Sequence, residues 1–134
     1  SNLTYKRYHN LKTLFGKLFW TQALTKSFVW RYLYKTDFIK RNKLKFDVSL
    51  ISQEDALFVL DSFVKSNNVT IVPDVNYHYL FNENSALNKK DKQHCDKLKQ
   101  QYKIGKAFRK KFAFDNNVSI LWRLRKILAI LFMG

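Results

Sequence analysis

The clearest helix pattern of the chain begins with Ser52-Gln53-Glu54-Asp55 and continues into the apolar run Ala56-Leu57-Phe58-Val59-Leu60. This pattern predicts an amphipathic helix with Ser52 as its N-cap and Asp55 as the capping-box partner. Two adjacent carboxylates, Glu54 and Asp55, then share the first turn. Asp55 can be structural there, closing the cap, or chemical, taking a proton from a hydroxyl that docks at the start of the helix. These four residues alone favour the capping role.

The whole chain predicts an α+β fold that is mostly helical and has a few short strands. With 134 residues, 46% of them hydrophobic, it is long enough for one compact domain with a sizeable core. The spacing of the apolar residues separates helices from strands. The predicted elements are, in chain order, a helix over 3–26, a strand or extended segment over 28–34, helices over 37–42 and 52–66, strands over 69–72 and 75–81, a charged helix over 88–102, and two basic amphipathic segments within 103–134.

The charge of the chain is strongly positive. In all, 25 Lys and Arg stand against 10 Asp and Glu, a net charge of +15. The excess is concentrated in the last third, because residues 86–134 hold 13 Lys and Arg against 3 Asp. Such an imbalance indicates an anionic partner, which can be a phosphate-bearing substrate, nucleic acid or an acidic membrane surface. The single cysteine, Cys95, excludes an internal disulfide, and the lack of a CxxC motif argues against structural zinc.

Five motifs follow one another between residues 30 and 85. They read WRYLYKTDFI at 30–39, NKLKFD at 42–47, EDALF at 54–58, VPDVNYHY at 72–79 and NENS at 82–85. In this order they resemble the second half of bacterial family 2 glycosyltransferases, which are GT-A enzymes that build capsule, cell-wall and other surface polysaccharides. The resemblance implies that residues 1–85 are the acceptor-side portion of a GT-A catalytic domain. Residues 86–134 are then a basic helical C-terminal extension that associates with a membrane or a partner.

The resemblance also implies roles for individual residues. Asp55 would be the base that deprotonates the acceptor hydroxyl, and Glu54 would orient or bind the acceptor. Trp30, Tyr32 and Gln53 would contact the acceptor. The family often has Asn-Lys after the tryptophan and Gly before the Glu-Asp pair, where this chain has Arg31-Tyr32 and Gln53. Trp30 can be a stacking platform for a sugar or a core residue.

The donor side of a GT-A enzyme has no counterpart in the sequence. That side holds the nucleotide sugar on a Rossmann-like half whose Asp-x-Asp motif ligates Mg or Mn. This chain has no Asp-x-Asp motif, no glycine-rich βα turn and no alternating βαβ pattern. We therefore expect a fragment that binds no metal, binds no nucleotide-sugar donor and transfers no sugar without the missing N-terminal half. His78 is either an added metal ligand of the intact enzyme or a packed side chain.

The tail combines basic and aromatic residues over 103–134. Its last uncharged run, residues 127–133, is far shorter than the roughly 20 residues that span a bilayer. The tail can lie in the headgroup plane of an anionic membrane, near a lipid-linked or other saccharide acceptor, or it can be an ordinary terminal helix. The first alternative predicts a cytoplasmic protein that is peripheral on the inner face of the plasma membrane. The rival function is a basic nucleic-acid-binding or protein-interaction module without catalysis, but no RNP, KH, helix-turn-helix or zinc-finger signature supports nucleic acid as a partner.

Overall fold

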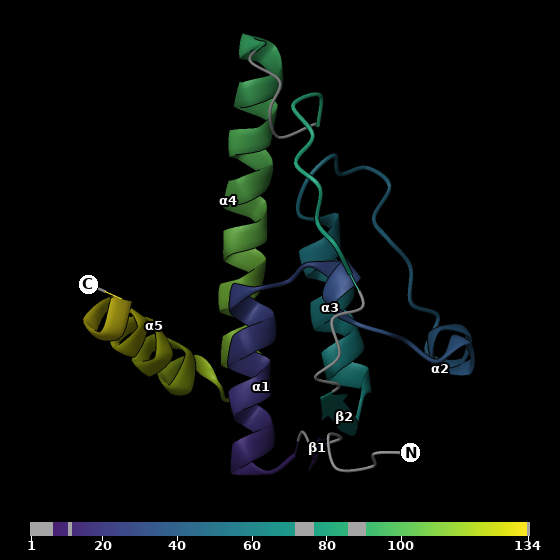
Figure 1. Ribbon diagram of the computed structural model, residues 1–134, viewed down its shortest axis with the longest axis vertical. Coiled ribbons are helices and arrows are strands. Elements are labelled where there is room, and N and C mark those ends of the chain that lie inside the picture. The colour runs from purple at the N-terminus through teal and green to yellow at the C-terminus, as the bar shows by residue number, and fades with distance from the viewer. Residues whose placement is uncertain (1–6, 11, 72–76, 86–90, 134) are drawn as a thin grey trace.

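The computed structural model describes residues 7–10, 12–71, 77–85 and 91–133. Over these ranges the chain is α+β and mostly helical, which confirms the predicted fold class (Figure 1). The elements are, in chain order, β1 (Arg7–Asn10), α1 (Leu14–Thr25), the 3-10 turn η2 (Val29–Arg31), α2 (Thr36–Arg41), α3 (Glu54–Lys65), β2 (Asn68–Ile71), α4 (Lys92–Asp115) and α5 (Ser119–Met133).

The two strands form a small antiparallel sheet in which Arg7 lies opposite Ile71 and Asn10 opposite Asn68. The predicted helix over 3–26 is therefore wrong at its start, because residues 7–10 pair with a segment sixty residues away in the sequence. Helix α1 begins only after Thr13, whose Oγ accepts a hydrogen bond from the Gly16 N–H at 3.0 Å. This is the usual bond of an N-cap residue. The local pattern could not reveal a pairing that depends on a distant partner strand.

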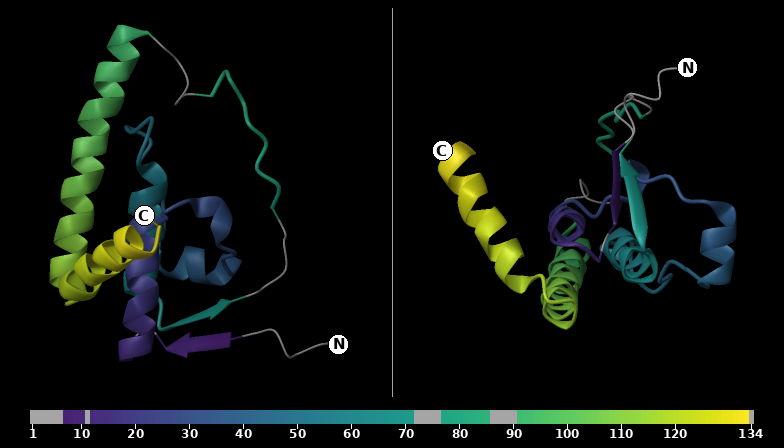
Figure 2. Two further views of the ribbon diagram at one scale, coloured as in Figure 1. Left: turned by 60° about the vertical axis from the view of Figure 1, so that its left-hand side comes forward. Right: turned by 90° about the horizontal axis from the view of Figure 1, so that it is seen from below.

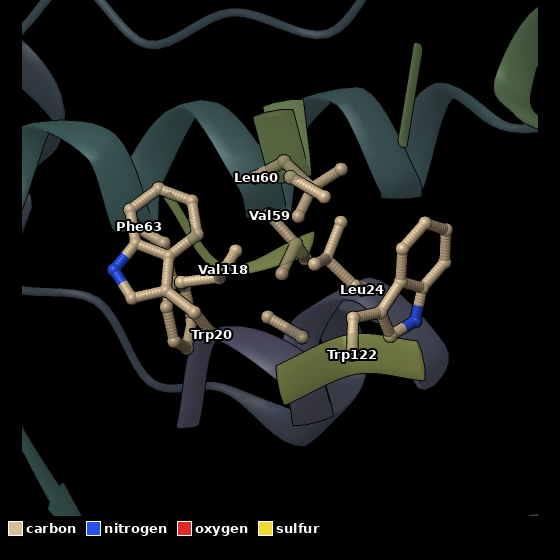
Figure 3. Packing of buried hydrophobic residues seen from close by; sticks show 9 residues of the cluster. Trp20, Leu24, Val59, Leu60, Phe63, Val118 and Trp122 are labelled. Carbon is tan, nitrogen blue, oxygen red and sulfur yellow. The ribbon is translucent and has the colours of Figure 1, made fainter. Parts of the chain in front are cut away.

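Helices α1, α3 and α4 lie side by side, and the first turns of α5 close one end of this bundle (Figures 1 and 2). Their facing sides bury one hydrophobic cluster, in which Trp20 packs its ring edge-on against Phe63 with 5.8 Å between ring centroids. Figure 3 shows this packing. The members of the cluster are Trp20, Ala23, Leu24, Val59, Leu60, Phe63, Ala113, Val118 and Trp122. Segments from both ends of the chain thus share one core, and the predicted division at residue 85 stays a prediction.

Two predicted strands are absent where the chain is described. The sequence predicts a strand or an extended segment over residues 28–34. These residues contain the 3-10 turn η2, and the residues on either side of it, Phe28 and Tyr32, have extended backbone. Residues 77–81 form no strand, and residues 75 and 76 lie outside the described ranges. Phe28, Trp30, Tyr77 and Tyr79 of these two segments instead stack on one another at the surface.

Helix α4 is longer than the predicted charged helix. Helix α4 continues to Asp115, well beyond the predicted end at residue 102, and Asp91 caps its start by accepting the His94 N–H at 2.9 Å. Residues 88–90 lie outside the described ranges. In the described part of the chain, no helix combines the length and apolar composition that crossing a membrane requires. The predicted short helix near 37–42 and the amphipathic helix that ends before Ser66 are confirmed.

Candidate functional site

The turn that leads into α3 carries both predicted catalytic carboxylates, but it is not the predicted capping box. The helix begins at Glu54, and the N-cap position is Gln53, whose backbone is left-handed with φ 73° and ψ −2°. No side chain caps the helix. The backbone N–H groups of Ile51 and Ser52 instead donate to Gln101 Oε1, at 3.0 and 2.9 Å. The capping prediction for Ser52 and Asp55 is wrong because a distant helix supplies the partners.

Three residues of α4 hold this turn, and we call Gln101, Gly105 and Arg109 the α4 brace. Their spacing of four residues places them on one face of the helix. Gln101 and Gly105 are buried. Arg109 Nη1 donates to Gln53 Oε1 at 2.7 Å, and burial lowers the pKa of this guanidinium. A Cβ atom on Gly105 would lie 2.8 Å from Gln53 Cγ, so any other residue at this position would force the Gln53 side chain to move.

Asp55 is half-buried and linked to the segment before α2. Its Oδ2 accepts a hydrogen bond from the Val29 backbone N–H at 3.2 Å. Among the described residues, Oδ1 of Asp55 has no recorded partner. The carboxylate is therefore fixed through one oxygen, while the second is available to another group. A carboxylate in this arrangement can accept a proton from a hydroxyl that reaches the start of α3.

Glu54 lies beside it with one unsatisfied oxygen. The side chain as a whole is half-buried, and its Oε2 is buried without a hydrogen-bond partner in the described chain. Buried polar atoms nearly always have a partner, and each exception calls for a reason such as a functional role or a missing ion, water or ligand. Glu54 Oε2 is therefore a candidate contact for a group that the described part of the chain does not supply.

An exposed aromatic stack is joined to Asp55 through Val29. Trp30 follows Val29 directly, and its ring stacks on Phe28 and Tyr77 with centroid distances of 5.5 and 4.7 Å. Tyr79 lies tilted beside it at 6.0 Å. Since Trp30 is 40% exposed, it is not the core residue that one alternative proposed. We call Phe28, Trp30, Tyr77 and Tyr79 the aromatic stack.

Tyr32 and Tyr34 face the body of the molecule. Tyr32 packs edge-on against Phe63 with 5.6 Å between centroids, and burial raises its pKa. Tyr34 packs edge-on against Phe58, and its hydroxyl lies 3.4 Å from Ser62 Oγ in a hydrogen bond. Burial, with smaller contributions from Tyr32 and Asp55, raises the pKa of Tyr34 to about 12. The ring of Tyr32, a predicted acceptor contact, therefore packs against the core.

His78 is exposed on the segment that carries the aromatic stack. Within the described ranges, no three His, Cys, Asp or Glu side chains come together in a group that could hold a metal ion. The described residues therefore offer no metal centre of their own. Mg or Mn stays a prediction for the intact enzyme, and no step below depends on it.

A shallow groove of about 440 Å³ borders the turn at the start of α3, next to Glu54 and Asp55. Its lining comes from the turn before α3 and from the first half of α4, and comprises Ser52, Gln53, Leu98, Lys99, Tyr102 and Lys103. Gln53, a predicted acceptor contact, lines the groove, whereas Glu54 and Asp55 do not. The predicted roles of these residues stay predictions.

Sequence reasoning missed the α4 brace and the Val29 amide. A signal for the brace was present, because Gln101, Gly105, Arg109 and Ala113 recur every four residues in a helix of long charged side chains. A glycine inside a helix lowers its stability by about 1 kcal/mol and usually has a packing reason. The sequence held no signal for the hydrogen bond from Val29 to Asp55. Every residue except proline has a backbone N–H, so the residue type does not show which one donates.

The chain is 34% identical over 82 residues to the uncharacterised glycosyltransferase EpsJ of Bacillus subtilis (strain 168). This match covers 60% of the chain and 24% of EpsJ, so the chain corresponds to about a quarter of that protein. No family model matches the chain. No solved structure matches it either. The chain is therefore related in sequence to a glycosyltransferase.

Proposed function

We propose that this chain is the acceptor-side part of a family 2 (GT-A) glycosyltransferase. In the intact enzyme it would hold a saccharide or lipid-linked acceptor while a sugar is transferred to that acceptor from a nucleotide-sugar donor. The reaction would belong to the synthesis of a surface polysaccharide. The observation that carries the proposal is the sequence similarity to a glycosyltransferase. The placement of Asp55, fixed through one oxygen and open through the other, supports it.

Asp55 acts as the base in this proposal. Its carboxylate takes the proton of the acceptor hydroxyl as that oxygen bonds to the anomeric carbon of the donor sugar. The bond from this carbon to the nucleoside diphosphate breaks, and the diphosphate leaves with the electron pair. In-line displacement requires a base held in a fixed direction. The Val29 amide and the α4 brace support such a fixed position.

The aromatic stack is the proposed platform for the acceptor sugar. Trp30 is stacked on Phe28 and Tyr77, and both of these rings are about half exposed, at 49 and 50%. The aromatic surface open to a sugar therefore belongs to the stack as a whole. Its attachment through Val29 to the Asp55 carboxylate would hold sugar and base on one local frame. Glu54, with its unsatisfied oxygen, would bind or orient a second group of the acceptor.

The donor would be bound by a separate half of the enzyme. We propose that this half supplies the nucleotide-sugar site and the divalent metal, with His78 as the one ligand that this chain could add. By itself, the chain is expected to transfer no sugar.

Sugar transfer by a protein that joins this chain to its donor-binding half tests the proposal. Asp55→Asn keeps the size of the side chain but removes the base, so turnover should fall roughly 10²-fold or more. Asp61→Asn is the matched control, because Asp61 lies on the same helix in an exposed pair with Lys65. It should leave turnover nearly unchanged. Full activity of Asp55→Asn in a folded protein would contradict the assignment, and transfer by the chain alone would contradict the division of labour.

A further inference from the structure

Helix α5 carries an apolar stripe that nothing in the described chain covers. Ile120, Leu124, Ile127 and Leu131 recur at the spacing of one helix face, and they are 75, 50, 53 and 69% exposed. Trp122, on the other side of the helix, is 8% exposed and belongs to the core. The helix is thus anchored by its first turns and extends away from the bundle, as Figures 1 and 2 show. We call these four residues the α5 stripe.

A group of cations lies where α5 meets α4. Lys126 Nζ sits 3.8 Å above the centre of the Trp122 ring. Partial burial lowers the pKa of Lys126, and the charges of Lys106, Lys110 and Arg109 on α4 lower it further. The ion pairs recorded among the described residues involve Asp61, Asp96 and Asp115 and include none of these four cations. Arg109 is half-buried and bonded to Gln53, so we call the three lysines Lys106, Lys110 and Lys126 the cation cluster.

The α5 stripe and the cation cluster together favour one kind of binding partner. Apolar residues along one face of a helix with uncompensated cations nearby are the features of helices that lie in the interface of an anionic membrane. A second copy of the chain is disfavoured, because each copy carries a net charge of +15 and would bring its own cation cluster close to the first. At 15 residues, α5 is about 22 Å long and fits the membrane surface without crossing it.

We propose that α5 binds the surface of an anionic phospholipid bilayer, with the α5 stripe inserted below the headgroups, while the cation cluster, on the Trp122 side of the helix, attracts the protein to the negatively charged surface. The inference concerns a surface apart from Asp55 and does not depend on the proposed sugar transfer. It also names a binding partner for the basic tail, whose cations other than Arg109 have no role in the chemistry proposed for Asp55.

Flotation of the full 134-residue chain with phospholipid vesicles tests the proposal. Vesicles of phosphatidylcholine mixed with phosphatidylglycerol should carry the protein upward, and vesicles of phosphatidylcholine alone should carry much less. Lys106→Gln with Lys110→Gln should weaken binding to the anionic vesicles about tenfold, on the order expected for two charges that act near a membrane surface. Lys40→Gln with Lys45→Gln removes the same charge from exposed positions elsewhere and should have a small effect. Arg109 stays unchanged because it also holds Gln53.

The stripe is tested with its own pair of variants. Leu124→Ser with Leu131→Ser should also reduce binding by roughly tenfold or more. Each substitution removes the favourable free energy of transferring a leucine side chain from water into the membrane. Leu33→Ser with Val48→Ser is the control, because these side chains are 90 and 97% exposed but lie outside α5. All substituted positions are exposed, so thermal melts should show intact folding.

Insertion is measured with an environment-sensitive fluorophore on a cysteine. Leu131→Cys in a Cys95→Ser background should give a blue shift on anionic vesicles, and Val48→Cys in the same background should not. Equal binding to neutral and anionic vesicles, or binding that neither pair of variants weakens, would overturn the proposal. So would a dimer that forms without lipid and dissociates in the Leu124→Ser, Leu131→Ser variant. Tight oligonucleotide binding without vesicle binding would assign the cluster to nucleic acid and overturn it as well.

Discussion

Asp55 takes its hydrogen bond from the backbone of a distant segment, although its sequence position fits the cap of its own helix. The bond from Val29 at 3.2 Å occupies Oδ2 and draws the 3-10 turn η2 against the start of α3. The side chains that follow, Tyr32 and Tyr34, then reach the core beside Phe63 and Phe58. One carboxylate thus positions the segment that carries Trp30 on the outside and two tyrosines on the inside.

The buried hydroxyl of Tyr34 makes stability depend on pH in the alkaline range. The unfolded chain loses this proton near pH 10, whereas the folded chain keeps it to about 12. Between these values the unfolded state binds fewer protons, so the free energy of unfolding falls as the pH rises. Urea unfolding across this range should show a smaller fall for Tyr34→Phe than for the wild type. Tyr32, whose pKa is also raised, retains part of the effect in the variant. Parallel curves for the two proteins would show that Tyr34 titrates normally.

At the residue scale, the sequence predicted which carboxylates lie on the first turn of α3 but not how that turn is held. Ser52 and Asp55 match a capping box as a motif, and the motif is a local pattern. In the structure the Ser52 amide, which Asp55 would accept in a capping box, donates to Gln101, 49 residues further along the chain. A local motif competes with tertiary contacts that only the folded chain supplies. Gln53 shows the same limit, since its left-handed backbone would ordinarily call for glycine.

At the scale of elements, the contact between α3 and α4 depends on the absence of a side chain at Gly105. A Cβ there would lie 2.8 and 2.9 Å from Gln53 Cγ and Cδ, while Arg109 holds the end of the same side chain. Gly105→Ala should therefore displace Gln53 and break its bond to Arg109. The expected loss exceeds the gain of about 1 kcal/mol that alanine brings to a helix. We expect a net destabilisation of about 1 kcal/mol in urea unfolding.

A double-mutant cycle separates the clash from helix propensity. Gln53→Gly removes the obstructing side chain and suits the left-handed backbone. In that background, Gly105→Ala should become stabilising by about 1 kcal/mol. The sign of the Gly105→Ala effect should thus reverse between the two backgrounds. The same sign and size in both would mean that the α4 brace does not act through Gln53.

The elements that the sequence predicted well are those whose pattern is local. Helix α3 has apolar residues on one face and stops near Asn67, and α5 likewise shows its helical spacing. The elements that it missed depend on partners. Strand β1 requires β2, and the aromatic residues at 28–30 and 77–79 stack across a surface where their composition indicated strands. Helix α4 continues past its predicted end at residue 102, and Gly105 inside it approaches Gln53, the N-cap residue of α3.

At the scale of the whole molecule, one hydrophobic cluster joins the first helix to the last. Trp122 of α5 is 8% exposed, and its neighbours in the cluster come from α1, α3 and α4. Trp122→Ala should therefore destabilise the whole molecule by about 3–5 kcal/mol. Thermal unfolding should remain a single transition at a lower Tm, because the helices share the cluster.

Leu131→Ala is the matched control for this substitution. Leu131 lies on the same helix but is 69% exposed, so its replacement should change the free energy of unfolding by less than about 0.5 kcal/mol. A Tm of Trp122→Ala equal to that of the wild type would mean that α5 does not contribute to the core. Two separate transitions in the wild type would mean that the C-terminal helices unfold independently of α1 and α3.

The length of α4 sets how far the turn that carries Glu54 and Asp55 stands from the end of the protein where α5 begins. The turn rests on Gly105, and the helix ends at Asp115, ten residues later. This interval is about 15 Å along the helix axis. If α5 lies on a lipid surface, α4 fixes the distance between Asp55 and that surface, and a short oligosaccharide attached to a lipid could reach across it. Shortening or lengthening α4 by one turn would then change which sugar of a tethered glycan meets the carboxylate.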